Sequence, residues 1–203
     1  SLTIPNSVTS IGSSALYGCS SLESINVSSG NKAYCSIDGN LYNKAQTELI
    51  QYAVGKKDKA FSIPQGVTSI GKSAFEGCSS LKSITLPDSL TSIGYDAFFN
   101  CNVTNIYICD LKAYMEIDFQ GSHSMTLSYA PNLYLNGELL AGNVIIPDGV
   151  TKIPEYMFLN NKNITGVTIP NSVTSIEDHA FYNCTGLTNV TIPNSVISID
   201  SSA

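Results

Sequence analysis

The chain has few charged residues and no excess of basic ones, which excludes several classes of partner. Charged side chains make up 13% of the 203 residues, with 16 acidic against 10 basic residues and a formal net charge of -6. Nucleic acids and anionic membrane surfaces are bound through clustered lysine and arginine, so we expect no nucleic-acid partner. The low charge and abundant serine, threonine, asparagine and glycine favour a β-rich surface with short polar groups.

The sequence also lacks segments that would place it in a membrane. It has no run of 18 apolar residues, so we expect no membrane insertion. Its N-terminus has no basic stretch followed by an apolar one, as a signal peptide would have. Because residues 1–5 and 199–203 begin and end within a repeated pattern, we expect a fragment of a longer protein, with any signal peptide or anchor outside it.

Catalytic and metal-binding combinations of residues are missing as well. Only two histidines occur, and a surface role is favoured over catalysis for both His123, in a predicted loop, and His179, at a variable position. There is no Cys-x-x-Cys or close histidine pair for zinc and no phosphate-binding loop. Asp38-Gly-Asn40 lacks the further acids of a calcium loop and is more typical of a turn. We expect no cofactor and no enzymatic activity.

What the sequence does contain is one motif repeated along its length. The best copy, 81–101, follows L-x-x-I-x-L-P-x-x-L-x-x-I-G-x-x-A-F-x-x-C. Pro64 and Pro87 are 23 residues apart, and the same spacing separates Pro147, Pro170 and Pro193. A unit with about six apolar anchors is too small for a core of its own, so the units must stack. Eight strand starts are predicted, at residues 2, 22, 61, 81, 103, 144, 164 and 187.

Alternation within the copy at 81–101 predicts which side chains form the core. Leu81, Ile84 and Leu86 are expected to point inward, and Ser83 and Thr85 outward, because Ile84-Thr-Leu86 alternates as a half-buried strand does. The proline that follows ends the strand, since it has no N–H for a ladder.

The second half of each copy is predicted to turn back. Gly94 permits a turn that a Cβ would hinder, and residues 96–100 are expected to make a single helical or 3₁₀ turn with Phe98 as the large filler. Cys35 and Cys109 lie outside the pattern, and free thiols or a disulfide both fit the sequence. Four cysteines close the copies and are expected to be small buried thiols rather than disulfides: Cys19, Cys78, Cys101 and Cys184.

Two segments interrupt the repeat, at about 30–60 and about 109–143. In the first, two short apolar runs within 36–52 predict a β-hairpin. In the second, 111–119 is either a short helix or a bent strand, and Asn136-Gly137 between apolar runs predicts a tight hairpin.

The repeated phase L-x-x-I-x-[IL]-P-x-x-[VL]-T-x-I-G-x-x-A-F-x-x-C resembles the leucine-rich repeats of BspA-like bacterial surface proteins, over essentially the whole chain. The resemblance implies a right-handed leucine-rich repeat solenoid, with 1–203 as a single domain, a parallel concave sheet and short helical or 3₁₀ turns. It also implies a cell-surface or secreted location, in host-associated bacteria or some protozoa, and adhesion or binding rather than a reaction.

Candidate binding residues are those that the motif leaves free. The outward strand positions, on the face that horseshoe repeats usually use for binding, are Ser83, Thr85, Tyr107, Thr168, Asn189 and Thr191; the other interpretation is that they only keep this face soluble. Tyrosines supply contact area at low entropic cost, so a second group, which could equally cap the coil edges, is Tyr34, Tyr42, Tyr52, Tyr129 and Tyr134. Two functions stay open: a surface module that binds a protein or a glycan, and a structural spacer that presents another domain of the full-length protein.

Overall fold

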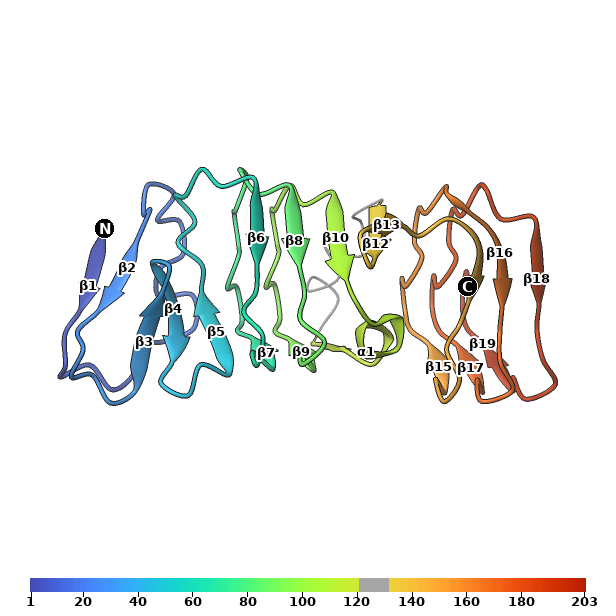
Figure 1. Ribbon diagram of the computed structural model, residues 1–203, viewed down its shortest axis with the longest axis horizontal. Coiled ribbons are helices and arrows are strands. Elements are labelled where there is room, and N and C mark those ends of the chain that lie inside the picture. Colours follow the sequence, from blue (N-terminus) through green and yellow to red (C-terminus); the bar gives the residue numbers. More distant parts are fainter. Residues whose placement is uncertain (121–131) are drawn as a thin grey trace. The chain divides into compact units, whose positions relative to one another are not determined.

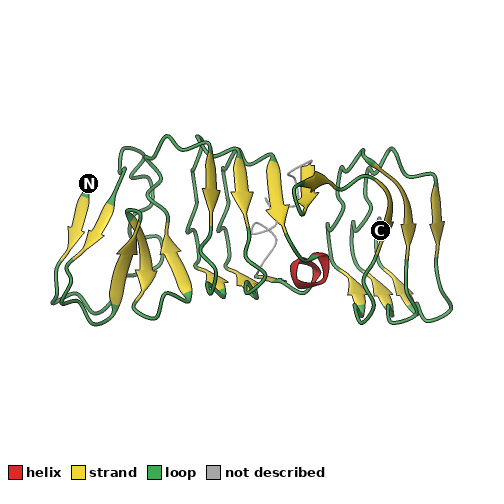
Figure 2. Cartoon of the chain, in the orientation of Figure 1, coloured by secondary structure: helices red, strands yellow, loops and turns green. Residues whose placement is uncertain are grey.

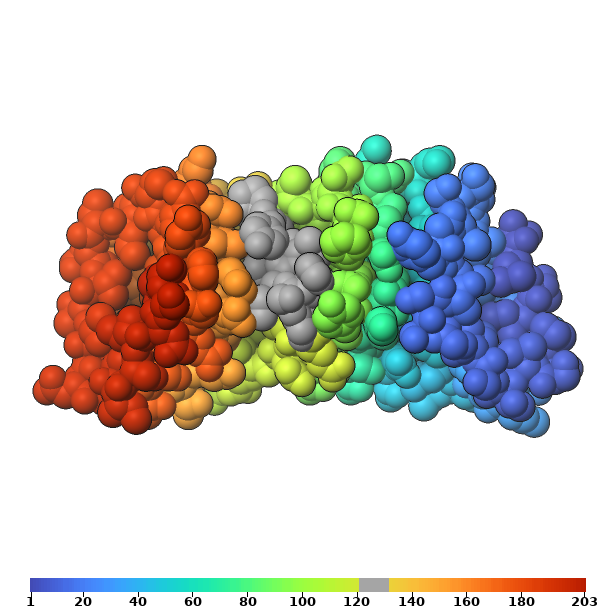
Figure 3. Space-filling model, turned by 180° about the vertical axis from the view of Figure 1, so that it is seen from behind, coloured from blue at the N-terminus to red at the C-terminus, as the bar shows by residue number. Residues whose placement is uncertain are grey.

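The computed structural model describes residues 1–120 and 132–203. It forms two compact units, which are considered separately: among the described residues, unit 1 comprises 1–103 and 117–120, and unit 2 comprises 104–116 and 132–203. The chain is a β-solenoid of about 8 turns of about 23 residues. Strands form nearly all of its regular structure, with one short helix in the described part (Figures 1 and 2). Within each unit, successive coils appear as adjacent bands of colour (Figure 3).

Unit 1 contains two rows of strands. The first row pairs β1 (Leu2–Ile4) in parallel with β2 (Ile25–Val27), and β6 (Ala60–Ser62) with β8 (Ser83–Thr85). The second row has the order β11-β9-β7-β5-β4-β3 and consists of β3 (Tyr34–Ile37), β4 (Asn40–Asn43), β5 (Glu48–Gln51), β7 (Ser69–Ile70), β9 (Ser92–Ile93) and β11 (Asp118–Phe119).

Unit 2 repeats this plan. Its first-row strands are β10 (Asn105–Ile108), β12 (Asn132–Leu135), β14 (Gly142–Ile145), β16 (Ile164–Thr168) and β18 (Asn189–Thr191). Its second row is the parallel set β15 (Lys152–Ile153), β17 (Ser175–Ile176) and β19 (Ser198–Ile199). The helix α1 (Leu111–Met115) and the short strand β13 (Glu138–Leu139) complete the unit.

The predicted first-row strands are confirmed, and their starts differ by at most three residues from those expected. In the copy at 81–101, Leu81, Ile84 and Leu86 are buried, while Ser83 and Thr85 are half-buried on the opposite face. The second row was not predicted. It arises because Ser-Ile pairs such as Ser92-Ile93 alternate outward and inward over two residues, which is enough for one rung of a parallel ladder.

The predicted helical or 3₁₀ turn is wrong: residues 94–101 form successive β-turns. The N–H groups of Ala97, Phe99 and Cys101 donate to the carbonyls three residues earlier, whereas Asp96 and Asn100 have φ of 57° and 56°, which interrupts any helix. Alternate N–H groups of such a segment instead donate to the neighbouring coil. The Phe75 N–H, for example, donates to the Ala97 carbonyl at 2.7 Å. Inter-coil hydrogen bonds therefore override helix formation here.

The repeat glycine is required by close packing between coils rather than by the turn. A Cβ on Gly94 would lie 2.7 Å from the backbone nitrogen of Lys72 in the preceding coil, whereas one on Gly12 would meet nothing within 4 Å. Contact with the preceding coil therefore disfavours a side chain at position 94.

Both interruptions contain the predicted hairpins. Strand β4 pairs antiparallel with β3 and β5, and the β3–β4 turn has positive φ at Asp38 and Gly39, so Asp38-Gly-Asn40 is a turn as expected. In the second interruption β12 pairs antiparallel with β13, and Asn136 and Gly137 again have positive φ. Of the two alternatives for 111–119, the structure contains a helix followed by strand β11.

All six cysteines are free, but the expectation that the four in phase are buried is only partly right. Cys78 is buried, and its hydrogen bond with the Cys101 thiol, together with burial, raises its pKa. Cys101 and Cys184 are partly exposed, and each thiol donates to a phenylalanine carbonyl of the preceding coil, at 2.8 and 2.9 Å. Cys19 is exposed.

Candidate binding surfaces

The outward side of β14, β16 and β18, which we call the β14–β18 face, holds three of the predicted residues. The parallel register forms two rows across the strands: Asn143, Gly166, Asn189 and, beside it, Ile145, Thr168, Thr191. The Asn143 amide donates to the Thr168 hydroxyl at 3.1 Å. Thr168, Asn189 and Thr191 are exposed, so this face is a neutral polar surface.

Sequence reasoning missed Ile145, the exposed apolar member of the β14–β18 face. Its side chain is 69% exposed and aligns with Thr168 on the neighbouring strand. The missed signal is the alternation Asn143-Val144-Ile145, in which Val144 is buried and the residues on either side are exposed.

The remaining predicted residues lie elsewhere and are more enclosed. In unit 1, Ser83 and Thr85 are half-buried and face Ala60 and Ser62 in register on β6. In unit 2, the half-buried Tyr107 stacks on Tyr134, with ring centroids 4.5 Å apart and planes at 16°. Tyr107 thus forms a flat aromatic pair with a tyrosine of the second interruption.

The tyrosines of the interruptions do not form one surface. Tyr42 and Tyr52 are buried in the core, and burial raises the pKa of both phenols, so their assignment as contact residues is wrong. They are buried because β4 and β5 fill the core position that a regular coil would occupy. Tyr34 is half-buried, and its hydroxyl accepts a hydrogen bond from the Ile11 N–H at 3.0 Å. Tyr129 lies outside the described residues.

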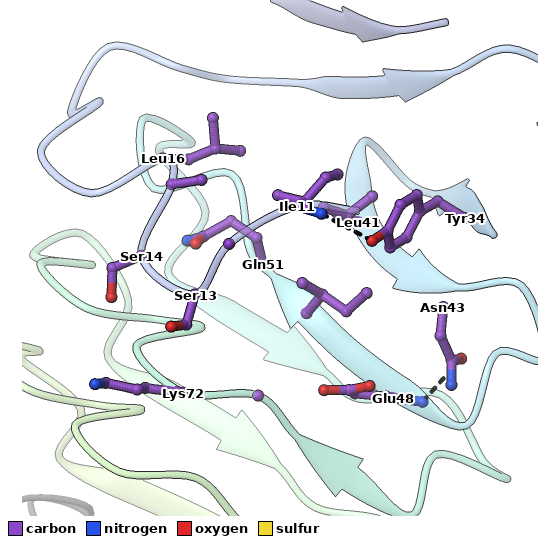
Figure 4. A pocket seen from close by; sticks show the side chains of 14 residues that line it. Ile11, Ser13, Ser14, Leu16, Tyr34, Leu41, Asn43, Glu48, Gln51 and Lys72 are labelled. Carbon is purple, nitrogen blue, oxygen red and sulfur yellow. Dashed lines mark hydrogen bonds between the residues drawn. The ribbon is translucent and has the colours of Figure 1, made fainter. Parts of the chain in front are cut away.

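A cleft of about 260 Å³ lies in unit 1 between the turn of the first coil and the first interruption (Figure 4). Its lining comes from three places in the chain: 11–16, strands β4 and β5 with Tyr34 beside them, and Gly71-Lys72. Leu16, Leu41 and Ile50 are the larger apolar side chains, while Glu48 and Lys72 supply one charge of each sign. Its size is just below that of common small-ligand pockets.

His179 packs against aromatic rings in unit 2. His179 lies between two tyrosine rings, with centroids 5.1 Å from Tyr156 and 5.0 Å from Tyr182, and is therefore partly enclosed in an aromatic column rather than fully on the surface. His123 lies outside the described residues. Within 1–120 and 132–203, no three His, Cys, Asp or Glu side chains are grouped to hold a metal ion. No helix in these ranges has the length and apolar character needed to cross a bilayer.

Solved structures of bacterial leucine-rich repeat proteins share this fold. A leucine-rich repeat protein from Eubacterium ventriosum matches with a TM-score of 0.66 and 25% identity over 98% of this chain and 56% of its own. A leucine rich cell surface protein from Faecalibacterium prausnitzii matches with a TM-score of 0.55 and 33% identity, over 100% and 51%. The pneumococcal vaccine antigen PcpA shares the fold, with a TM-score of 0.54 and 21% identity over 98% and 50%.

This chain therefore spans about half the length of the solved proteins it matches. A comparison with curated proteins finds no match. The family described as BspA type leucine rich repeat region matches residues 1–56, 54–135 and 132–203, which together cover the sequence from end to end. The chain belongs to the BspA type leucine-rich repeat family.

Proposed function

We propose that this chain is a non-catalytic interaction module, located at the bacterial cell surface or secreted, that binds a protein or a glycan through the outward faces of its parallel strands. The observation that carries the proposal is the β14–β18 face. Its two rows contain an exposed isoleucine, two threonines and two asparagines, and these side chains are not needed to fill the core.

The chemistry of this face suits recognition. Asparagine and threonine both donate and accept hydrogen bonds, and Ile145 adds apolar area at one end of the row that it forms with Thr168 and Thr191. Gly166, between Asn143 and Asn189 in register, has no side chain, and a Cβ there would lie 2.6 Å from the Asn143 side-chain oxygen. The Asn143 side chain therefore lies over the buried Gly166 backbone, and no charge in the two rows repels either sign of partner.

The experiment compares two double variants with equal added charge. Thr168→Lys/Thr191→Lys places two lysines on the β14–β18 face, and Asn171→Lys/Asn194→Lys places them three residues later in the same coils, at exposed corners. The labelled intact chain and both variants are applied to a glycan array and to an array of extracellular proteins. A ligand of this face should bind the first variant about tenfold or more weakly, since two charges at a neutral interface cost over 1.4 kcal/mol.

Binding that is equal for both double variants would remove the β14–β18 face from the proposal. An absence of ligands on both arrays would favour the structural spacer, in which the repeats only position another part of a longer protein.

A further inference from the structure

The turn segments of regular coils have all their inter-coil donors on one edge. In unit 1 the Ser73 N–H donates to the Tyr95 carbonyl at 3.0 Å, and the Phe75 N–H donates to the Ala97 carbonyl at 2.7 Å. In each case the donor lies in one coil and the acceptor in the next coil along the chain. The peptide units of a turn segment therefore point their N–H groups toward the next coil.

The first coil has the same donors but no acceptors for them. Ser14 and Leu16 occupy the phases of Ser73 and Phe75, and Ser14 has the same left-handed φ, 62° against 56°. Within the described residues, neither the Ser14 N–H nor the Leu16 N–H has a hydrogen-bond partner. Both residues line the cleft, which lies on the side where the next coil would be.

The first interruption explains why the cleft is open. On the second-row side, β3 and β4 continue the sheet beyond β5, and the Ile11 N–H contacts the Tyr34 hydroxyl instead of another strand. Two extra strands add about 10 Å to the separation between the first coil and β5. On the first-row side β1 and β2 remain directly paired, so the opening is wedge-shaped.

Ile50 lines the cleft from a position that is glycine in the next two coils. The register Leu49–Ile70 and Ile70–Ile93 places Ile50 in the phase of the repeat glycines Gly71 and Gly94. A Cβ at those glycines would approach the preceding coil to 3.3 and 2.7 Å. The Ile50 side chain faces the cleft instead. In unit 2 Glu177 occupies the same phase between directly stacked coils, so the cleft is argued from the inserted strands and the unpaired donors and not from this phase.

We propose that the cleft binds an extended peptide segment of a partner protein, whose carbonyl groups accept hydrogen bonds from the Ser14 and Leu16 N–H groups. An extended chain presents the carbonyls of alternate residues on one edge, as the donors require. One apolar side chain of the peptide packs against Leu16 and Ile50, which are partly exposed in the cleft. Because Glu48 and Lys72 offset each other in the lining, neutral peptide carbonyls fit better than a free anion.

This site extends the proposed function. It rests on that function because it takes the partner to be a protein. The probe is a displayed library of random octapeptides, selected on the intact 203-residue chain. Selected peptides are then tested on Ile50→Trp, which fills the cleft, and on Ile197→Trp, which makes the same change at a side chain that is 87% exposed in the last coil. We expect Ile50→Trp to weaken binding about tenfold or more, and Ile197→Trp to leave it unchanged.

Amide NMR of the unmodified chain tests the site without relying on the folding of a variant. A selected peptide should shift the Ser14 and Leu16 amide protons downfield, while acetate and phosphate leave them in place. The proposal is overturned if no peptide is selected, if peptides bind both tryptophan variants equally, or if only the anions shift these amides. The lysine variants of the β14–β18 face test the proposed function separately, so the two can fail independently.

Discussion

Replacing Phe75 by alanine should remove the centre of the aromatic core of unit 1. The Phe75 ring is fully buried and stacks on Phe98 at 4.7 Å and on Tyr52 at 5.1 Å, with Phe61 at 5.9 Å in a tilted arrangement. These rings come from successive coils and from the first interruption. The stacked rings therefore hold together segments that are adjacent in space but separated in the sequence.

The expected cost follows from the size of the ring and from its contacts. A buried Phe→Ala substitution costs about 3–5 kcal/mol through lost burial and the cavity that remains. Aromatic pairs add about 0.5–1.5 kcal/mol each beyond burial, so we expect the upper end, about 5 kcal/mol. Phe181 in unit 2 is partly exposed, with its one stacked partner Phe158 at 5.4 Å, and Phe181→Ala should cost roughly half as much.

Urea unfolding followed by far-ultraviolet circular dichroism measures both costs, since the midpoint falls in proportion to the loss of free energy when the slope is unchanged. Phe75→Leu is the control for volume: it keeps most of the apolar bulk and should cost about 1–3 kcal/mol, mainly through lost ring stacking. Equal costs for Phe75→Ala and Phe181→Ala would refute the aromatic column as the core of unit 1.

Three further predictions concern the close approach of coils at Gly94, the burial of Ile84 and the titration of the Cys184 thiol. Gly94→Ala should lower the melting temperature because its Cβ meets backbone at 2.7 Å, while Gly12→Ala, with nothing within 4 Å, should leave it unchanged or slightly raised; equal shifts would contradict the close-approach explanation. Ile84→Asp should abolish cooperative thermal unfolding, since it buries an unpaired charge at a fully enclosed position, and an unaltered melting curve would show that Ile84 does not face the core. Burial raises the pKa of the Cys184 thiol from its ordinary 9.0 to about 11, so between these values the unfolded chain releases its proton before the folded chain does. The free energy of unfolding should then fall as pH rises from 9 to 11, as measured by urea midpoints against a Cys184→Ser control, and identical pH profiles would contradict the shift.

The parts of the fold that sequence predicted are those set by periodicity or by local turn chemistry. The spacing of apolar residues placed Leu81, Ile84 and Leu86 inside, because a strand alternates whatever lies beside it. The Asn136-Gly137 hairpin was predictable because its positive φ values are a local preference of those residues. Neither prediction required knowledge of how one coil packs against another.

The parts that sequence did not predict depend on neighbouring coils. In the regular coils the second row consists of two-residue strands, such as β7 and β9, which are too short to give a periodic signal of their own. Residues 96–100 look helical by composition, but the Ala97 and Phe99 carbonyls accept hydrogen bonds from N–H groups of the preceding coil. Tyr42 was expected at the surface because its segment departs from the motif, yet it is buried where the interruption replaces a coil.

A position in a stacked repeat is restricted by the coils on both sides of it. At Gly94 the preceding coil is close, because a Cβ there would lie 2.7 Å from the Lys72 backbone nitrogen. Ile50 is the opposite case: it occupies a glycine phase and faces the cleft, where β3 and β4 displace the first coil. The same displacement leaves Ser14 and Leu16 without acceptors among the described residues. The opening in unit 1 is therefore lined by donors that a regular coil would have paired.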